Sequence, residues 1–222
     1  MKRSTEKRTA DSHQFIDSYL SEIRHCLEVL DKETLELATD MVMETYRTNG
    51  KIFIFGNGGS ASISSHLACD LAKGTLRRVY DNFERRLRVI SLTDNVALMT
   101  AFANDLSYDN IFIQQLRNLI ETGDLVIGIS GSGNSKNIIK AIAYAKKCGA
   151  RTIGFLGFKT GGKLKDMVDC AIVVDSNNYG PIEDLHQILG HLLAAWIAKA
   201  KSEHDGVKNK KRENNAVPFF ID

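Results

Sequence analysis

The sequence predicts a single doubly wound α/β domain with a five-stranded parallel sheet flanked by helices. Short runs rich in Ile, Val, Leu and Phe alternate with helical patterns along the chain, and within these runs polar and apolar residues do not alternate. Strands of that kind are covered by helices on both faces, and strand–helix–strand units fold as right-handed crossovers between parallel strands. The expected strands are residues 51–55, 88–92, 125–130, 151–155 and 171–175, and the expected helices are 60–73, about 95–103, 108–120, 135–147 and 182–200.

A long amphipathic segment at residues 12–48 precedes the first expected strand. Its apolar residues recur every three or four positions, which predicts a helical segment with a break near Leu30 and Asp31. The segment is longer than one small domain needs to cover its sheet, so we expect part of its apolar stripe to face another subunit. The domain is expected to span residues 12–200. Residues 201–222 are expected to form a polar C-terminal tail, whose apolar end is either frayed or docked on a neighbour.

Composition and charge exclude several classes of function. The 222 residues carry a formal net charge of +2, and the one basic run, 208–212, lies in the polar tail, so we expect no nucleic-acid binding. No run approaches the ~20 apolar residues of a membrane span, and the N-terminus lacks the apolar core of a signal peptide. We therefore expect a cytoplasmic protein without a membrane partner. The four cysteines form no C-x-x-C pair and are expected to be buried free thiols.

The turn after the first expected strand, Gly56-Asn57-Gly58-Gly59-Ser60, opens directly into a helix. Glycines let the backbone approach a ligand closely, and a helix start offers free N–H groups to an anion. A tight turn that needs glycine only for its backbone angles is the alternative. Two nucleotide motifs fit poorly, because Ala61 stands at the third glycine of G-x-G-x-x-G and the Gly-Lys-Ser/Thr of a P-loop is missing. We interpret this segment as a ligand-binding turn.

The turn after the third expected strand, Ser130-Gly131-Ser132-Gly133-Asn134-Ser135, also opens a helix. Its three hydroxyls and its backbone N–H groups suit the three terminal oxygens of a phosphate monoester. A flexible linker is the alternative, but a linker would not lie between a buried strand and an amphipathic helix. Because ligands of open parallel sheets bind at the carboxyl ends of the strands, the sequence predicts a phosphate site here.

These two turns, the stretch SLTDNVALMTAFANDLSYDNIF and a late E-D-x-H helix resemble the sugar isomerase (SIS) domain family, and within it the phosphoheptose isomerase group. The likeness runs from about residue 12 to residue 200 in the same order and spacing. It implies a flavodoxin-like SIS fold and an aldose–ketose isomerase of carbohydrate metabolism. The implied reaction converts sedoheptulose 7-phosphate to D-glycero-D-manno-heptose 7-phosphate through an enediol. The resemblance also implies a homotetramer with sites shared between subunits.

The resemblance implies a role for individual residues. The implied substrate-binding set comprises Asn57, Gly58, Gly59, Ser60, Asp94, Ser130, Gly131, Ser132, Ser135 and Glu183, with the three serines of the second turn on the phosphate. Either Asp70 or Glu183 would be the base and His191 the partner acid, on opposite sides of the substrate. His66, Asp70, Glu183 and His191 are the positions that supply zinc ligands in some members. Hydrogen bonds across a helix pair are the alternative for these four residues.

This sequence departs from the family's usual pattern at two of these positions. Asp70 stands where the family usually has Glu, and Glu183 stands where it usually has Gln. The side chain of Asp70 is one methylene shorter, so its reach to a substrate carbon is in question. Glu183 adds a carboxylate that could act as base or metal ligand. Two alternatives stay open: a non-catalytic phosphosugar-binding regulatory or assembly protein, and an isomerase of another phosphosugar.

Overall fold

The computed structural model describes residues 2–80 and 84–213, with the side chains of residues 11–80 and 84–205. Its centre is a five-stranded sheet in the order β2-β1-β3-β4-β5, in which every neighbouring pair is parallel. The strands are β1 (Lys51–Gly56), β2 (Arg88–Ser91), β3 (Leu125–Ser130), β4 (Arg151–Leu156) and β5 (Cys170–Val173). The predicted doubly wound fold and its five strands are confirmed.

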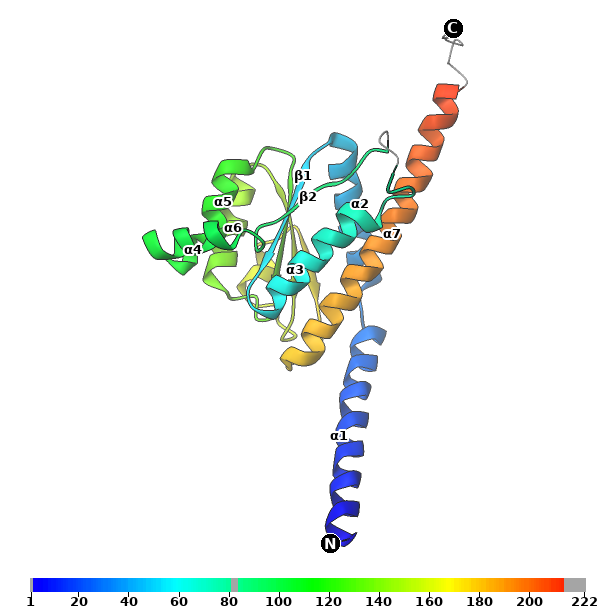
Figure 1. Ribbon diagram of the computed structural model, residues 1–222, viewed down its shortest axis with the longest axis vertical. Coiled ribbons are helices and arrows are strands. Elements are labelled where there is room, and N and C mark those ends of the chain that lie inside the picture. Colours follow the sequence, from blue (N-terminus) through cyan, green and yellow to red (C-terminus); the bar gives the residue numbers. More distant parts are fainter. Residues whose placement is uncertain (1, 81–83, 214–222) are drawn as a thin grey trace.

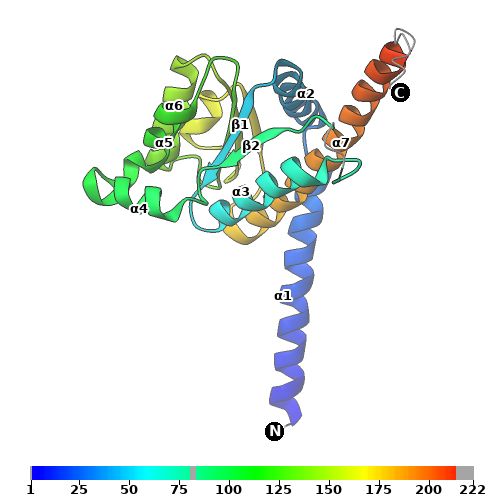
Figure 2. The ribbon, with the colours of Figure 1, turned by 45° about the horizontal axis from the view of Figure 1, so that its top comes forward.

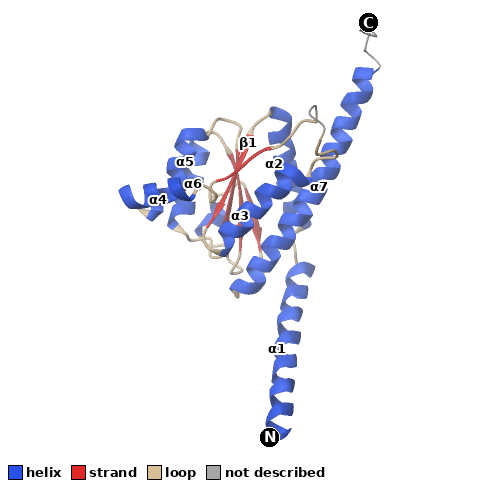
Figure 3. Ribbon diagram, viewed as in Figure 1, coloured by secondary structure: helices blue, strands red, loops and turns tan. Residues whose placement is uncertain are grey.

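Helices cover both faces of the sheet. They are α1 (Lys2–Glu28), α2 (Lys32–Thr48), α3 (Gly59–Cys69), α4 (Val96–Asp105), α5 (Ile111–Leu119), α6 (Lys136–Lys147) and α7 (Tyr179–Glu213). Helices α2, α3 and α7 lie on one face, and α5 and α6 lie on the other (Figures 1 and 3). A π-helical turn, Asp70–Gly74, directly continues α3.

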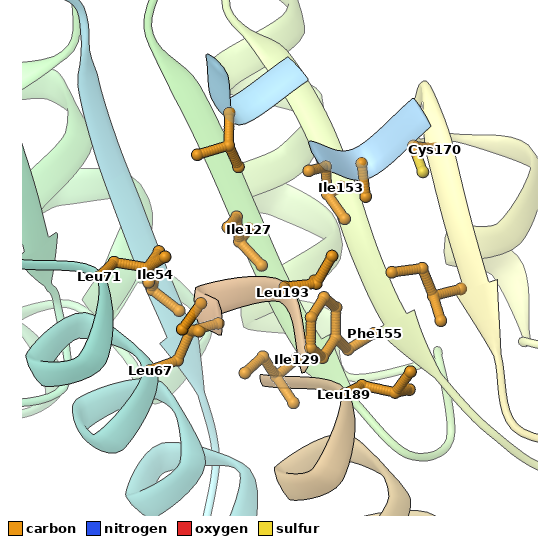
Figure 4. Close-up of a cluster of buried hydrophobic side chains, with 14 of the residues drawn as sticks. Ile54, Leu67, Leu71, Ile127, Ile129, Ile153, Phe155, Cys170, Leu189 and Leu193 are labelled. Carbon is orange, nitrogen blue, oxygen red and sulfur yellow. The ribbon is translucent and has the colours of Figure 1, made fainter. Parts of the chain in front are cut away.

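Each face of the sheet buries its own apolar core, because successive strand residues point to opposite faces. In β1, Ile52 and Ile54 join the core under α2, α3 and α7, whereas Phe53 and Phe55 join the core under α5 and α6. Figure 4 shows the first core, where Ile54, Ile127, Ile129, Ile153 and Phe155 of the strands meet Leu67, Leu71, Leu189 and Leu193 of the helices. Burial on both faces explains why the strands lack polar–apolar alternation.

The predicted break in the N-terminal helical segment is confirmed at Asp31. Its Oδ1 accepts a hydrogen bond from the Glu33 N–H at 3.0 Å and so caps α2. Helix α1 projects away from the body of the domain (Figures 1 and 2), and its Phe15, Ile16 and Leu20 are 71%, 49% and 55% exposed. No residue of α4 is buried, although this helix is mainly apolar. Both helices therefore carry apolar surface that the rest of the described chain leaves uncovered.

Helix α7 continues beyond the predicted helix end at residue 200, into the segment expected to be a polar tail. Lys201 is buried there and donates a hydrogen bond to Glu84 Oε1 at 2.7 Å. Burial would raise the pKa of Glu84, but the hydrogen bonds from Lys201 and from the backbone of Arg77 and Arg78 outweigh it and lower the pKa to about 2. This ion pair ties the segment before β2 to α7. The remainder of the predicted tail, residues 214–222, lies outside the described residues.

The four cysteines are free thiols, as predicted, but only two of them are buried. Cys26 and Cys170 are buried, whereas Cys69 is exposed and Cys148 is half-buried, so the prediction of burial was wrong for these two. Cys69 is the last residue of α3 and Cys148 follows the last residue of α6, where each helix leaves its core.

No helix within the described ranges has an apolar stretch that could cross a membrane.

Candidate functional site

A pocket lies where the sheet reverses its strand order, at the carboxyl ends of β1 and β3. From β1 the chain crosses to β2 on one side, and β3, β4 and β5 extend on the other. Open parallel sheets bind ligands at such a switch point. The pocket has a volume of about 140 Å³ and is lined by Asn57, Ser60, Ile129, Ser130, Gly131, Ser132, Ser135, Tyr179 and Glu183. Most of the predicted substrate-binding residues therefore meet in one place, and Gly58 and Gly59 belong to the same turn.

The serine turn, residues 130–135, is arranged to hold an anion. The Oγ of Ser130 accepts a hydrogen bond from the Gly133 N–H at 3.1 Å and lies 3.4 Å from the Oγ of Ser135. Ser132 Oγ accepts the N–H of Asn134 at 3.2 Å. Ser135 is the N-cap residue of α6, but its hydroxyl does not cap the helix. The Ile138 N–H already donates to Asn137 Oδ1 at 2.9 Å, but the hydroxyl groups and the earlier N–H groups of α6 are available to a ligand.

The loop at residues 157–162 packs against the serine turn and fixes its shape. Gly133 has a φ of +61°, and a Cβ at this position would collide with the carbonyl of Gly161. In the same loop Phe158 has a φ of +52°, which is uncommon for a bulky residue. Its ring packs edge-on against Tyr179, with 4.7 Å between the ring centroids. Residues in sparsely populated backbone regions cluster at binding sites. Phe158 fits this pattern, because its ring packs against Tyr179, which lines the pocket.

Asn57 is held in the pocket by two residues that the sequence did not single out. The Asn57 amide donates to Asn137 Oδ1 at 2.9 Å, and the Asn137 amide donates back to Asn57 Oδ1 at 2.9 Å. The Tyr108 hydroxyl also donates to Asn57 Oδ1, at 3.0 Å. Asn137 is buried on α6, so this pair ties the turn after β1 to the helix after β3. The available signal was an asparagine on the apolar face of α6.

Glu183 reaches the pocket from α7 and contacts the turn after β1. Helix α3 begins at Gly59, and a Cβ on this residue would lie 2.6 Å from Glu183 Oε1. Glycine is therefore needed for the approach of the carboxylate. Because the carboxylate lies at the N-terminus of α3, the helix dipole favours its negative charge. Tyr179, four residues earlier on α7, is a further lining residue that the sequence did not indicate.

Further along the same two helices, His66, Asp70 and His191 form a second cluster. The Nε2 atoms of the two histidines are 3.0 Å apart, and Asp70 Oδ2 lies 3.4 Å from His66 Nε2 and 3.5 Å from His191 Nε2. Asp70 Oδ2 is buried and has no hydrogen-bond partner among the described residues. Gln187, which the sequence did not single out, places its Nε2 3.1 Å from His191 Nε2. Imidazole nitrogens and a carboxylate oxygen that converge in this way can hold a divalent metal.

Glu183 does not join this cluster, so the four predicted metal ligands do not meet within one chain. Eight residues of α7 separate Glu183 from His191, which is about 12 Å along a helix axis. Asp70 and His191 lie side by side, 3.5 Å apart, and not on opposite sides of a substrate-sized gap as the sequence suggested. The candidate site therefore has two parts, the serine-lined pocket and the His66–Asp70–His191 cluster, joined along α3 and α7.

The predicted contact Asp94 and a buried histidine, His186, lie outside both parts. Asp94 follows β2, and its Oδ1 accepts a hydrogen bond from the hydroxyl of Ser65 on α3. It does not line the pocket. His186 is fully buried on α7, with its Nε2 3.0 Å from the carbonyl oxygen of Leu156. Burial lowers the pKa of His186 to about 4, so the ring is neutral near pH 7 and donates its Nε2–H to that carbonyl. This histidine attaches α7 to the end of β4.

The chain is similar to known proteins over most of its length. A family profile described as SIS domain matches residues 17–157. A phosphoheptose isomerase of Thermodesulfovibrio yellowstonii is 36% identical over 216 residues, which cover 96% of this chain and 97% of that protein. A phosphoheptose isomerase of Helicobacter pylori is 37% identical over 177 residues, covering 80% of this chain and 88% of that protein.

Solved structures of phosphoheptose isomerases have a similar fold. GmhA from Neisseria gonorrhoeae has a TM-score of 0.75 and 27% sequence identity, covering 86% of this chain and 98% of that chain. A phosphoheptose isomerase from Francisella tularensis has a TM-score of 0.76 and 25% identity, covering 86% of this chain and 97% of that chain. The similarity in structure thus includes nearly the whole of each of these two proteins.

Gly133→Ala is expected to distort the serine turn, because the added methyl group collides with the Gly161 carbonyl and φ is positive. We expect a loss of about 3 kcal/mol in the free energy of unfolding and loss of inorganic phosphate binding. Gly58→Ala is the matched control: its φ is +57°, but no atom lies within 4 Å of the added Cβ. It should cost about 1 kcal/mol. Urea denaturation measures both values, and equal losses would contradict the steric argument.

Proposed function

This chain belongs to the SIS-domain family and to its phosphoheptose isomerase group, and we propose that it converts sedoheptulose 7-phosphate to D-glycero-D-manno-heptose 7-phosphate through an enediol. The observation that carries the proposal is the serine-lined pocket at the start of α6. A carboxylate and a histidine lie further along the helices that border it. The serine-lined pocket can bind the phosphate, and the His66–Asp70–His191 cluster can transfer protons.

Ser130, Ser132 and Ser135 hold the phosphate of the substrate in this proposal. Their hydroxyls can donate to the terminal oxygens, and the N–H groups at the start of α6 add further donors. Among the described residues, neither lysine nor arginine lines the pocket. Recognition of the phosphate therefore depends on hydroxyl groups, backbone N–H groups and the helix dipole.

The separation of the two parts of the site suits a long phosphosugar. From Gly59 to His66 is about 10 Å along α3, and from Glu183 to His191 is about 12 Å along α7. An extended seven-carbon chain with its phosphate in the serine turn spans a distance of this order, so that C1 and C2 lie near Asp70. Shorter phosphosugars bound in the same way place their reactive carbons short of it. This geometry favours a heptulose phosphate over the other phosphosugars.

Asp70 is the base in the proposed reaction, and His191 serves the carbonyl oxygen. The C1 proton of the ketose moves to the Asp70 carboxylate while O2 receives a proton from the imidazolium of His191, which gives the enediol. The carbon-bound proton then returns from Asp70 to C2, and the hydroxyl proton of O1 passes to the histidine. C1 and C2 are neighbours, and O1 and O2 lie on one side of a cis-enediol. A base and an acid 3.5 Å apart can therefore serve both steps.

The short side chain of Asp70 is compatible with this role because of the local backbone. Asp70 begins the π-helical turn Asp70–Gly74, which interrupts the regular helix, and such turns are frequent at functional sites. Its Oδ2 lies 3.4 Å from His66 Nε2 and 3.5 Å from His191 Nε2. An aspartate at this position therefore still presents a carboxylate beside His191.

We further propose that His66, Asp70 and His191 bind a zinc ion. Their ligand atoms all lie within 4.8 Å of one another, and the unpaired buried Oδ2 of Asp70 supports a role as ligand. Three protein ligands leave a position open for a substrate oxygen. With zinc bound, His191 would be a neutral ligand, and the ion would polarise the carbonyl oxygen in place of the imidazolium. Asp70 has two carboxylate oxygens, so one can bind the metal while the other takes the proton.

The active form in this proposal is a cytoplasmic homotetramer whose sites are completed by neighbouring subunits. Uncovered apolar surface on α1 and α4 supports assembly, since soluble proteins rarely leave such patches in water. On α4, Val96 is 66% exposed and follows closely after Asp94, a predicted substrate contact that does not line the pocket of its own chain. Four free thiols agree with the reducing cytoplasm.

The purified protein is expected to convert sedoheptulose 7-phosphate to an aldose heptose phosphate, followed by proton NMR. Asp70→Asn should lower kcat at least about 100-fold, because it removes the general base. Asp40→Asn, at an exposed position of α2, is the control and should leave kcat unchanged. Binding of sedoheptulose 7-phosphate without turnover, with or without zinc, would contradict the isomerase and favour a regulatory phosphosugar-binding protein. Turnover of a shorter phosphosugar alone would overturn the choice of substrate.

About one zinc ion per chain is expected in the purified protein by elemental analysis, from the three-ligand set. His66→Ala should reduce the zinc content sharply, because it removes one of the converging nitrogens. His13→Ala, at an exposed position on α1, should leave it unchanged. Equal zinc contents in all three proteins would refute the assignment of the ligands.

Light scattering at working concentration is expected to give the mass of a tetramer. Leu20→Lys places a charge on the uncovered stripe of α1 and should shift the protein to smaller species. Asp17→Lys adds a similar side chain at an exposed polar position of the same helix and should not. A wild-type monomer would rule out both the assembly and the shared site.

A further inference from the structure

Two helices begin at the serine-lined pocket, and each offers an anion-binding N-terminus. Helix α6 begins after Ser135, and helix α3 begins at Gly59 after the turn that follows β1. Residues of both starts, Ser60 and Ser135, line the same pocket. The first N–H groups of a helix lack partners within the helix, and its dipole attracts negative charge there. The pocket therefore has two places where an anion is favoured.

The anion position at the N-terminus of α3 is already occupied by the side chain of Glu183. The carboxylate of Glu183 lies so close to Gly59 that an added Cβ would be 2.6 Å from Oε1. Glu183 is half-buried and lines the pocket. The position at α6 is different, because the hydroxyl and backbone groups of the serine turn face it and no side chain of the described residues is shown to fill it. One anion position is thus filled by Glu183 and the other is open.

Glu183 is also the only charged residue that lines the pocket within the described part of the chain. A phosphate at α6 is stabilised by the serine turn and the helix N-terminus. A second anionic group on the same ligand would lie beside Glu183 with no cationic side chain to offset the repulsion. Sugar hydroxyls, in contrast, can donate hydrogen bonds to the carboxylate.

We propose that Glu183 acts as a charge filter, which restricts this pocket to ligands with one phosphate on a neutral polyhydroxyl chain. The pocket would reject phosphorylated sugar acids and sugar bisphosphates. This inference rests on the proposed function, since it requires that the serine turn bind the phosphate. It names a selectivity that the proposed isomerisation alone does not require.

Two ligands of equal length test the charge filter. Glycerol 3-phosphate and 3-phosphoglycerate both place a phosphate on a three-carbon chain, and the second adds a carboxylate. Both are too short to reach the His66–Asp70–His191 cluster about 10 Å away along α3. By titration calorimetry, the wild-type protein is expected to bind glycerol 3-phosphate at least about tenfold more tightly, as expected for two unit charges at short range.

Glu183→Gln keeps the shape of the side chain and removes its charge. It is expected to tighten binding of 3-phosphoglycerate about tenfold and to bring the ratio of the two affinities close to one. Asp184→Asn is the matched control, because Asp184 is the next residue on α7 but is exposed and accepts a hydrogen bond from Tyr19 outside the pocket. It should keep the wild-type ratio. Circular dichroism melting of each variant establishes that it is folded.

The outcomes separate the inference from the proposed function. A wild-type preference for 3-phosphoglycerate, or a ratio that Glu183→Gln leaves unchanged, would overturn the charge filter and leave the isomerase untouched. The expected ratios without turnover of sedoheptulose 7-phosphate would support the filter and overturn the isomerase. Failure of inorganic phosphate and of both ligands to bind would overturn the filter together with the phosphate site.

Discussion

The reversal of strand order between β1 and β3 is the constraint on which the site depends. Because these strands are parallel neighbours, the turns at residues 56–60 and 130–135 leave the sheet side by side, although they are far apart in the sequence. The two helices that follow must diverge to opposite faces of the sheet, so their N-termini open on one pocket. The Asn57–Asn137 amide pair then holds the turn after β1 against α6. The pocket is a result of the sheet topology, and its polarity is a result of the glycine and serine residues in the turns.

The contact between α3 and α7 connects binding to chemistry. The two helices run side by side in the same direction, with Glu183 against Gly59 at one end and His191 against His66 further along. Their inner faces join the apolar core on the sheet, which sets their positions by packing. The polar groups along their outer edges can therefore be held about 10 Å apart with the precision of packed helices. This spacing is the physical basis for preferring a seven-carbon substrate.

Much of this arrangement could be predicted from local patterns. The strands, the break near Asp31 and the serine turn were predicted because apolar runs, helical periodicity and glycine–serine clusters depend on residues close together in the chain. His66 and Asp70 are four residues apart, so helix spacing places them on one face. It did not indicate what lies opposite, which is why Gln187, Tyr179 and Asn137 were missed. Asn137 contacts Asn57 and Tyr179 contacts Phe158, both on other segments of the chain. Gln187 contacts His191 one turn along α7, a pair that the sequence analysis did not consider.

The sequence by itself determined the fold class, the position of both ligand turns and the family resemblance, because each depends on residues close together in the chain. Only the tertiary structure decided that Glu183 belongs to the phosphate pocket and not to the His66–Asp70–His191 cluster. It also decided that Asp70 and His191 are neighbours, and that Lys201 is buried on Glu84 instead of beginning a polar tail. Those outcomes depend on the axial register between packed helices. A shift of one helix by one turn along its axis changes every contact across the interface and leaves the sequence pattern of each helix unaltered.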